Sequence, residues 1–157
     1  MTAADIDAVT KIEAAVHLSY QEGEPVFQNR FALFPSGCFV CVSNGEPVGY
    51  MISHPWKRGE PVALDIMIEA VPADADCLYI HDLALLPEFR GGGAAQAAIS
   101  LAGDTARQLK LKSLAIVALP DALGFWDRMG FIPTPLSKDN AIARKYGPGA
   151  SYMERPI

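Results

Sequence analysis

The chain has 157 residues; 50% of them are hydrophobic, 20% are charged, and the formal net charge is -5 at pH 7. This length suits one domain with a hydrophobic core, taken here as residues 1–157, and the composition excludes a disordered chain. With a pI near 5.1 there is no basic excess to neutralise nucleic-acid phosphates, so we expect no nucleic-acid partner.

The N-terminal residues and the length of the apolar runs predict the cellular compartment of the protein. The N-terminus, MTAADIDAVTKIEAA, is acidic where a signal peptide would be basic, and no apolar run reaches transmembrane length. We therefore expect a cytoplasmic protein without a membrane partner, as a monomer or a homodimer.

The first segment predicts two helices. Residues 2–20 carry apolar side chains at helical spacing, with Thr2 or Asp5 as possible N-caps. The stretch QEGEPV is expected to break this helix. FQNRFALF, residues 27–34, is expected to form a second, short helix.

A β-hairpin is predicted next. Asn-Gly between two apolar runs is the strongest short-range hairpin signal, and it places antiparallel strands at about 38–43 and 47–54. Cys38 and Cys41 lie in the first of these strands and are interpreted as core thiols. The chain's three histidines show no ligand spacing, so we predict no metal site.

The rest of the chain predicts alternating strands and helices around a mixed sheet. The expected elements, in order, are a strand at 77–86, a helix at 93–112, a strand at 113–119, a short helix at 121–130, and last strands at 131–135 and 150–157.

Three consecutive glycines stand where the strand at 77–86 gives way to the following helix, in LLPEFRGGGAAQAA. A glycine-rich loop that leads into a helix presents unpaired backbone N–H groups, which together with the helix dipole can cradle a phosphate. A flexible turn is the alternative. The loop is not a Walker loop, because no Gly-Lys-Ser or Gly-Lys-Thr follows, and its spacing does not fit the dinucleotide-binding motif.

RGGGAA, residues 90–95, resembles Q/R-x-x-G-x-G/A, the pyrophosphate loop of the Gcn5-related N-acetyltransferase (GNAT) superfamily. ALGFWDRMGF, residues 122–131, is similar to the short helix and Gly-Phe strand start that follow that family's fifth strand. The resemblance implies an α/β (α+β) fold, with a central, mostly antiparallel mixed sheet of about six to seven strands flanked by about four helices. It also implies acetyl-CoA as co-substrate.

Within the superfamily, YIHDLALLPEFR is most similar to the fourth strand of the arylalkylamine (serotonin) and polyamine N-acetyltransferases, roughly L-H-x-L-A-V-H-x-x-F-R. This likeness implies direct transfer of the acetyl group to a primary amine of a small molecule in a ternary complex. Two alternatives stay open: a CoA-binding domain with little or no turnover, and an acetyltransferase of peptide or amino-acid amines.

The resemblance assigns the cofactor-binding residues by position. Backbone N–H groups of the loop would hold the pyrophosphate, the strand before it would pair with the pantetheine arm, and the N–H of Leu85 would lie near the thioester carbonyl. The residues so assigned are Leu83, Leu85, Arg90, Gly91, Gly93, Ala94, Ala95 and, beside the thiol, Trp126. Gly92 is not required by the motif.

The same resemblance suggests a base. The arylalkylamine branch uses two histidines one residue apart on this strand; here the second is His81 and the first position holds Tyr79. An imidazole can accept a proton near neutral pH, so His81 is predicted as base or proton relay, with Tyr79 as a water-holder or a core aromatic. Alternation along a strand predicts that Asp82 faces the other way.

The expected acid is missing. Many family members place a tyrosine where this chain has Trp126, and an indole N–H cannot supply a proton as a phenol does. Trp126 can also serve simply as core packing. Either the thiolate leaves unassisted or another residue replaces the tyrosine, for which Tyr146 and Tyr152 are the candidates.

Substrate selection is assigned to the loop SYQEGEPVF. Its Tyr20, Pro25 and Phe27, together with Trp56, are predicted to line an apolar slot for the amine.

Overall fold

A computed structural model describes residues 1–136 and 146–157 of the chain. It contains a six-stranded mixed sheet with four α-helices in the described residues, which confirms the predicted fold class. The sheet order is β1-β2-β3-β4-β6-β5, and of the strand pairs within the described residues the β3–β4 pair alone is parallel. The strands are β1 (Cys38–Ser43), β2 (Glu46–Trp56), β3 (Cys77–Leu85), β4 (Ser113–Ala118), β5 (Ile132–Pro133) and β6 (Ser151–Pro156).

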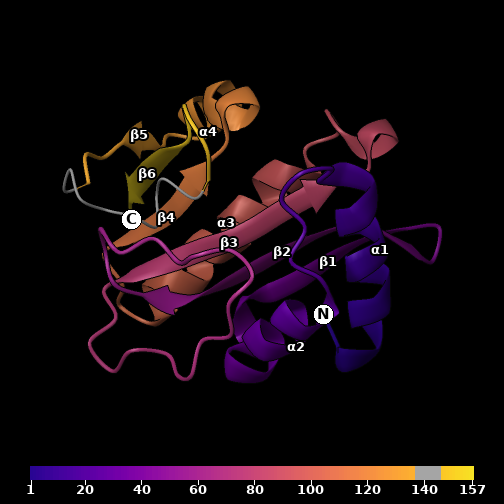
Figure 1. Ribbon diagram of the computed structural model, residues 1–157, viewed down its shortest axis with the longest axis horizontal. Helices are drawn as coiled ribbons and strands as arrows, with labels where there is room; N and C mark the ends of the chain where they lie inside the picture. Colours follow the sequence, from indigo (N-terminus) through magenta and orange to yellow (C-terminus); the bar gives the residue numbers. More distant parts are fainter. Residues whose placement is uncertain (137–145) are drawn as a thin grey trace.

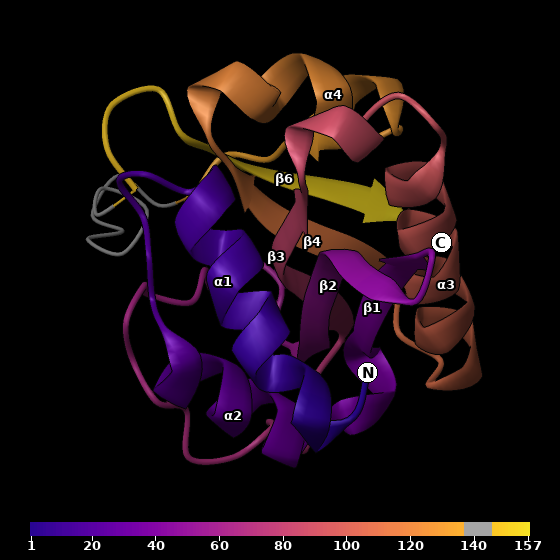
Figure 2. The same cartoon turned by 90° about the vertical axis from the view of Figure 1, so that its right-hand side faces the viewer.

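The helices cover both faces of the sheet (Figures 1 and 2). One face packs against α1 and α2, and the other against α3 and α4. Their bounds are α1 (Ile6–Val16), α2 (Glu24–Leu33), α3 (Ala94–Gln108) and α4 (Leu123–Arg128). No helix in the described part of the chain is long and apolar enough to cross a bilayer.

The predicted hairpin is confirmed. Asn44 and Gly45 connect β1 to β2, with φ of 52° and 87°, the left-handed conformation that such a tight turn requires. Thr2 begins the N-terminal helix region, where its backbone N–H donates to Asp5 Oδ2 at 2.6 Å.

The predicted start of the second helix was wrong. The helix α2 begins at Glu24 rather than at residue 27, and Pro25 lies within its first turn. A proline there costs no hydrogen bond, because the first N–H groups of a helix have no partner within it. Pro25 therefore lies in the first turn of a helix, whereas we had expected it to help break one.

The parallel strands β3 and β4 are paired over three residues only, Cys77–Tyr79 with 113–115. Beyond that point β3 continues to Leu85 and β4 to Ala118 without pairing to each other. The two strands diverge in Figure 1. The sheet is therefore open along one edge of β3.

A bulge in β3 lies at the start of this opening. On β2, Ile52 is paired with Asp82 and the next residue, Ser53, is paired with Ile80, so His81 is the extra residue. Tyr79 packs with one set of core residues and Ile80 with another, as alternation requires. Past the bulge the pattern shifts, since Leu83 contacts the α3 side of the sheet and Ala84 the α1 side.

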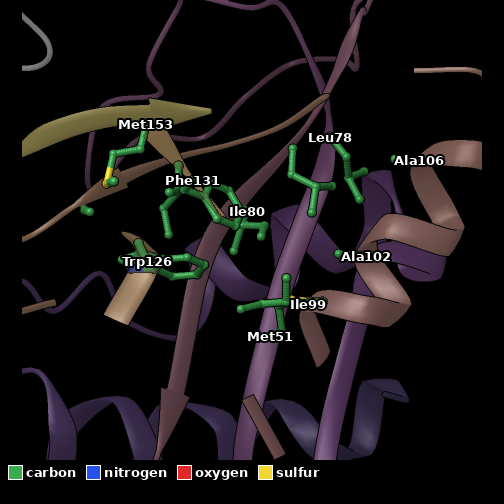
Figure 3. Packing of buried hydrophobic residues seen from close by; sticks show 12 residues of the cluster. Met51, Leu78, Ile80, Ile99, Ala102, Ala106, Trp126, Phe131 and Met153 are labelled. Atoms are coloured by element: carbon green, nitrogen blue, oxygen red, sulfur yellow. The ribbon is translucent and has the colours of Figure 1, made fainter. Parts of the chain in front are cut away.

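The larger core lies between the sheet and the helices α3 and α4 (Figure 3). Ile99 and Ala102 of α3 face Leu78 and Ile80 of β3 in this view. Alanines at the α3 positions nearest the sheet allow the helix to pack closely against it.

Phe131 anchors the α4 end of this core. It is fully buried, its ring centroid lies 5.0 Å from that of Trp126, and the Arg155 guanidinium lies 5.4 Å from the ring. Phe131→Ala should therefore lower the free energy of unfolding by about 3–5 kcal/mol, measured by urea denaturation. The matched control is Ile132→Ala next in sequence, where the side chain is exposed and a change within about 0.5 kcal/mol is expected. Equal losses in the two variants would contradict this account of the core.

Candidate active site

A cavity of about 570 Å³ occupies the opening between β3 and β4. Its walls come from the end of α1 and the loop after it, the bulged half of β3, the glycine-rich loop, the start of α3, β4 and α4. Most of the predicted site residues line it: Tyr20, His81, Leu83, Leu85, Arg90, Gly91, Gly93, Ala94, Ala95 and Trp126.

The glycine-rich end of the cavity has unpaired backbone donors. The first hydrogen bond of α3 runs from the Ala97 N–H to the Gly93 carbonyl at 2.9 Å. The N–H groups of residues 94–96 therefore have no acceptor within the helix and mark the positive end of its dipole. Arg90 borders this end, and its Nε donates to the Leu85 carbonyl at 3.1 Å. The local geometry is that of an anion site.

The open edge of β3 supplies further donors. The Leu86 N–H donates to the Val48 carbonyl on β2 at 3.0 Å. Because backbone groups alternate between the two edges of a strand, the N–H groups of Leu83 and Leu85 point away from β2 and toward the gap. An extended ligand can therefore pair with this edge as an added strand.

At the other end of the cavity, His81 is paired with Glu22. The His81 Nε2 and the Glu22 Oε2 are 2.7 Å apart, with exposed side-chain fractions of 0% and 4%. Both ring nitrogens of His81 are buried without a hydrogen bond of regular geometry in the described residues. Buried polar atoms left in this state are uncommon outside functional sites, which makes this pair the strongest candidate for proton transfer.

The position of Glu22 is fixed from two sides. Its Oε1 accepts a hydrogen bond from the Asp65 N–H at 2.8 Å. Its own backbone N–H donates to Glu13 Oε1 at 2.6 Å, and the Gly23 N–H donates to Glu13 Oε2 at 3.1 Å. Burial raises the pKa of Glu13. The α1–α2 loop is therefore held so that Glu22 reaches the sheet.

Sequence reasoning missed Glu22. It stands in a polar loop, 59 positions before its partner His81, and no local pattern joins the two. A hint of a buried carboxylate did exist in the sequence of α1. Glu13 occupies a position of the apolar stripe that also contains Ile6 and Val9, and the side chain of Glu13 is as buried as theirs. A carboxylate in such a stripe needs buried donors, and here they are the N–H groups of the loop.

A second histidine–carboxylate pair lies beside the first. The His17 Nε2 is 3.0 Å from Asp82 Oδ1, and the Tyr50 hydroxyl donates to Asp82 Oδ2 at 2.5 Å. The hydrogen bond to Asp82 raises the pKa of His17, although burial opposes it. Burial alone would raise the pKa of Asp82, but the bonds from His17 and Tyr50 outweigh it and hold that pKa below its usual value. His17 and Asp82 both line the cavity.

The prediction that Asp82 faces away from His81 was wrong. It assumed regular alternation, and the bulge at His81 breaks that alternation, so that adjacent side chains reach the same cavity. His17 was set aside in the sequence because its spacing to the other histidines suggested no site. Its partner comes from a strand 65 residues later.

Three of the predicted site residues lie outside the cavity. Tyr79 is 1% exposed, and its ring centroid is 6.3 Å from that of His81, behind it in the core. Burial raises the pKa of Tyr79. Phe27 is fully buried against Tyr50, and Pro25 lies in the first turn of α2. Trp56, named with them, does not line the cavity either.

The aromatic residues considered for the acid are placed differently. Trp126 packs in the core, as one interpretation predicted, and it also lines the cavity, while its contact with the CoA thiol stays a prediction. Tyr146 lines the cavity, but its hydroxyl donates to the Val62 carbonyl at 2.5 Å. The Tyr152 hydroxyl donates to Glu154 at 2.9 Å, away from the cavity.

Comparison with known proteins agrees with this geometry. A family model described as the Acetyltransferase (GNAT) family matches residues 6–131. Among curated proteins, no sequence matches the chain.

Solved structures share the fold at low identity. Ard1 from Thermoplasma volcanium is 17% identical with a TM-score of 0.75, covering 100% of this chain and 94% of that one. The GNAT-like decarboxylase GphF in complex with isobutyryl-CoA is 15% identical with a TM-score of 0.79, covering 98% and 95%. N-acetylglutamate synthase from Neisseria gonorrhoeae, complexed with coenzyme A and N-acetyl-glutamate, is 16% identical with a TM-score of 0.68, covering 99% of this chain and 32% of that one.

The three glycines of the loop differ in backbone conformation. Gly91 and Gly93 have φ of +83° and +86°, whereas Gly92 is outside the left-handed region, and a Cβ at any of the three would meet no atom within 4 Å. Gly93→Ala should lower the free energy of unfolding by about 1 kcal/mol, because only its backbone conformation disfavours a side chain. Gly92→Ala is the control, with an expected change within about 0.5 kcal/mol. Chemical denaturation measures both, and an equal effect would contradict the assigned backbone conformations.

Proposed function

The chain belongs to the GNAT acetyltransferase family, and on that premise we propose that it transfers an acetyl group from acetyl-CoA directly to a primary amine of a small molecule. The observation that carries the proposal is one continuous cavity with an anion site at one end and the His81–Glu22 pair at the other. A donor with a pyrophosphate and an acceptor that must lose a proton fit these two ends.

The donor end is proposed for acetyl-CoA. The N–H groups of residues 94–96, with those of the glycine loop, would receive the pyrophosphate, and the open edge of β3 would pair with the pantetheine arm. The solved structures of GphF and of the synthase contain isobutyryl-CoA and coenzyme A respectively, which supports a CoA thioester here. An N–H of Leu83 or Leu85 would then stabilise the oxyanion that forms as the amine attacks.

The acceptor end is proposed for the amine. A primary alkyl amine has a pKa near 10.4, so fewer than about one molecule in a thousand is free base at neutral pH. His81 is placed to take the proton, and Glu22 stabilises the imidazolium that results. Glu22 is thereby the residue that orients the base.

The lining favours an arylalkylamine over a polyamine. Val16, Tyr20, Leu64, Leu119 and Tyr146 give the cavity an apolar and aromatic wall outside the glycine-rich loop. Of the three carboxylates among the described lining residues, Glu22 and Asp82 are each already paired with a histidine, so only Asp121, in the turn before α4, is available to a second ammonium group. Among the described lining residues there is no lysine and the only arginines are Arg90 and Arg128, on the glycine loop and α4, so an acceptor carboxylate has no arginine or lysine beside His81.

A substrate panel tests the proposal. Thiol release from acetyl-CoA should be fastest with arylalkylamines, slower with polyamines, and slowest with amino acids and short peptides. Thermal stabilisation by CoA without thiol release on any amine would instead indicate a CoA-binding domain without turnover. Fastest release with peptides would contradict the small-molecule acceptor.

His81→Gln should lower kcat/KM by about 10²- to 10⁴-fold, because the amide cannot accept the proton. Glu22→Gln should cause a smaller loss, since the imidazole remains. The kcat/KM of both variants is measured between about pH 6 and about pH 8 with the amine of the panel that gives the fastest thiol release. Stabilisation by CoA in thermal unfolding shows that the variants are folded. Full kcat/KM in His81→Gln across this range would refute the assigned base.

A further inference from the structure

The transfer proposed above has an assigned base but no assigned acid. The departing CoA sulfur leaves as a thiolate unless it receives a proton, and even the thiol of cysteine has a pKa of about 8.5, so a thiolate takes up a proton readily at neutral pH. Trp126 occupies the position of the family's tyrosine, and its indole N–H does not ionise in the accessible range. A different residue must act if the thiolate is protonated as it leaves.

Few side chains of the cavity are of a type that can act as a general acid. Among the described lining residues, the histidines and tyrosines are His17, His81, Tyr20 and Tyr146. His81 is the proposed base, and the Tyr146 hydroxyl is bound to the Val62 carbonyl while burial raises its pKa. The arginines of the wall do not deprotonate in proteins. This leaves His17, with Tyr20 as its rival.

We propose that His17 is the general acid, and that its imidazolium donates a proton to the CoA sulfur as the thioester bond breaks. The inference rests on the proposed acetyl transfer. His17 lies next to the bulge, since its Nε2 contacts Asp82, the residue directly after His81 in the chain. The proposed base is thus a residue of β3, and the proposed acid is bound to the next residue of the same strand.

The surroundings of His17 favour the cation. The ring stands at the C-cap of α1, where the negative end of the helix dipole favours a positive charge. Asp82 is held against it by a second bond, from Tyr50. The charged or titratable groups that face or adjoin it, apart from its pair with Asp82, are Glu13 from α1, Glu22 and Tyr20 from the following loop, Tyr50 from β2, His81 from β3, and Asp121 from the turn before α4.

The ring geometry leaves one nitrogen for the reaction. Nε2 is engaged by Asp82, so Nδ1 is the donor, and the side chain is 20% exposed. The amine nitrogen forms a bond to the carbonyl carbon, and the carbon–sulfur bond breaks with its electron pair going to sulfur. The sulfur takes the proton of His17 Nδ1, and His81 takes the proton that the amine loses. Exchange with solvent then returns both histidines to their starting states.

The test compares His17→Gln with the wild type at saturating acetyl-CoA and amine. Glutamine can still bond to Asp82 but cannot donate a proton, so kcat should fall about 10²-fold while KM for acetyl-CoA is kept. His17 acts when protonated and its pKa is raised, so the wild-type kcat should decline as the pH rises through that raised value. The variant should lose this alkaline decline.

Two further variants sharpen the comparison. Lys11→Gln changes the exposed face of the same helix, where the side chain is 75% exposed, and is expected to keep the wild-type profile. Tyr20→Phe tests the rival. Loss of the alkaline decline in Tyr20→Phe but not in His17→Gln would overturn the proposal, as would full kcat in His17→Gln.

A measurement on the wild type covers the case in which His17→Gln does not fold. Imidazole NMR titration of the free enzyme should give His17 a pKa that matches the alkaline decline of kcat/KM, which reports groups of the free enzyme. A mismatch would overturn the assignment of the acid and leave the acetyl transfer intact. No thiol release by the wild type on any amine would overturn the proposed function, and this inference with it.

Discussion

The cavity of the candidate active site exists because β3 and β4 stop pairing with each other after three residue pairs. Up to Tyr79 the backbone groups of the two strands form hydrogen bonds with each other. Beyond Tyr79 the backbone N–H and C=O groups on this edge of β3 face a gap instead. A free strand edge inside a protein is costly unless something pairs with it. The cavity and the unpaired edge follow from this one separation of the strands, and the N-terminus of α3 lies beside them.

The bulge at His81 places titratable side chains in this opening. By inserting one residue against β2, it brings His81 and Asp82 into the same cavity, and each meets a partner from the α1 side of the sheet. Glu22 and His17 belong to one short segment, the end of α1 and the loop that follows. A single loop, held by the buried carboxylate of Glu13, therefore completes both pairs.

The sequence predicted what is encoded locally. The Asn-Gly hairpin and the strand–glycine–helix unit were found because a few adjacent residues determine their backbone conformation. Resemblance to a family, not spacing, singled out His81. Glu22 and His17 were missed because their partners are 59 and 65 residues away, and Asp82 was misplaced because a bulge leaves no mark in the strand pattern. The start of α2 was misjudged because a proline reads as a helix breaker unless its place in the first turn is known.

The two ends of the cavity differ in how they come to exist during folding. The anion end is formed by consecutive residues, from Leu83 to Gln96, and needs little more than β3 and α3. The acceptor end requires the loop after α1 to dock on a strand that the ribosome makes some sixty residues later. Contacts that close long loops are slow to form, and such regions open before the whole molecule unfolds. The cavity thus has an anion end built by local folding and an end with the two histidine–carboxylate pairs that exists only while the loop after α1 stays docked.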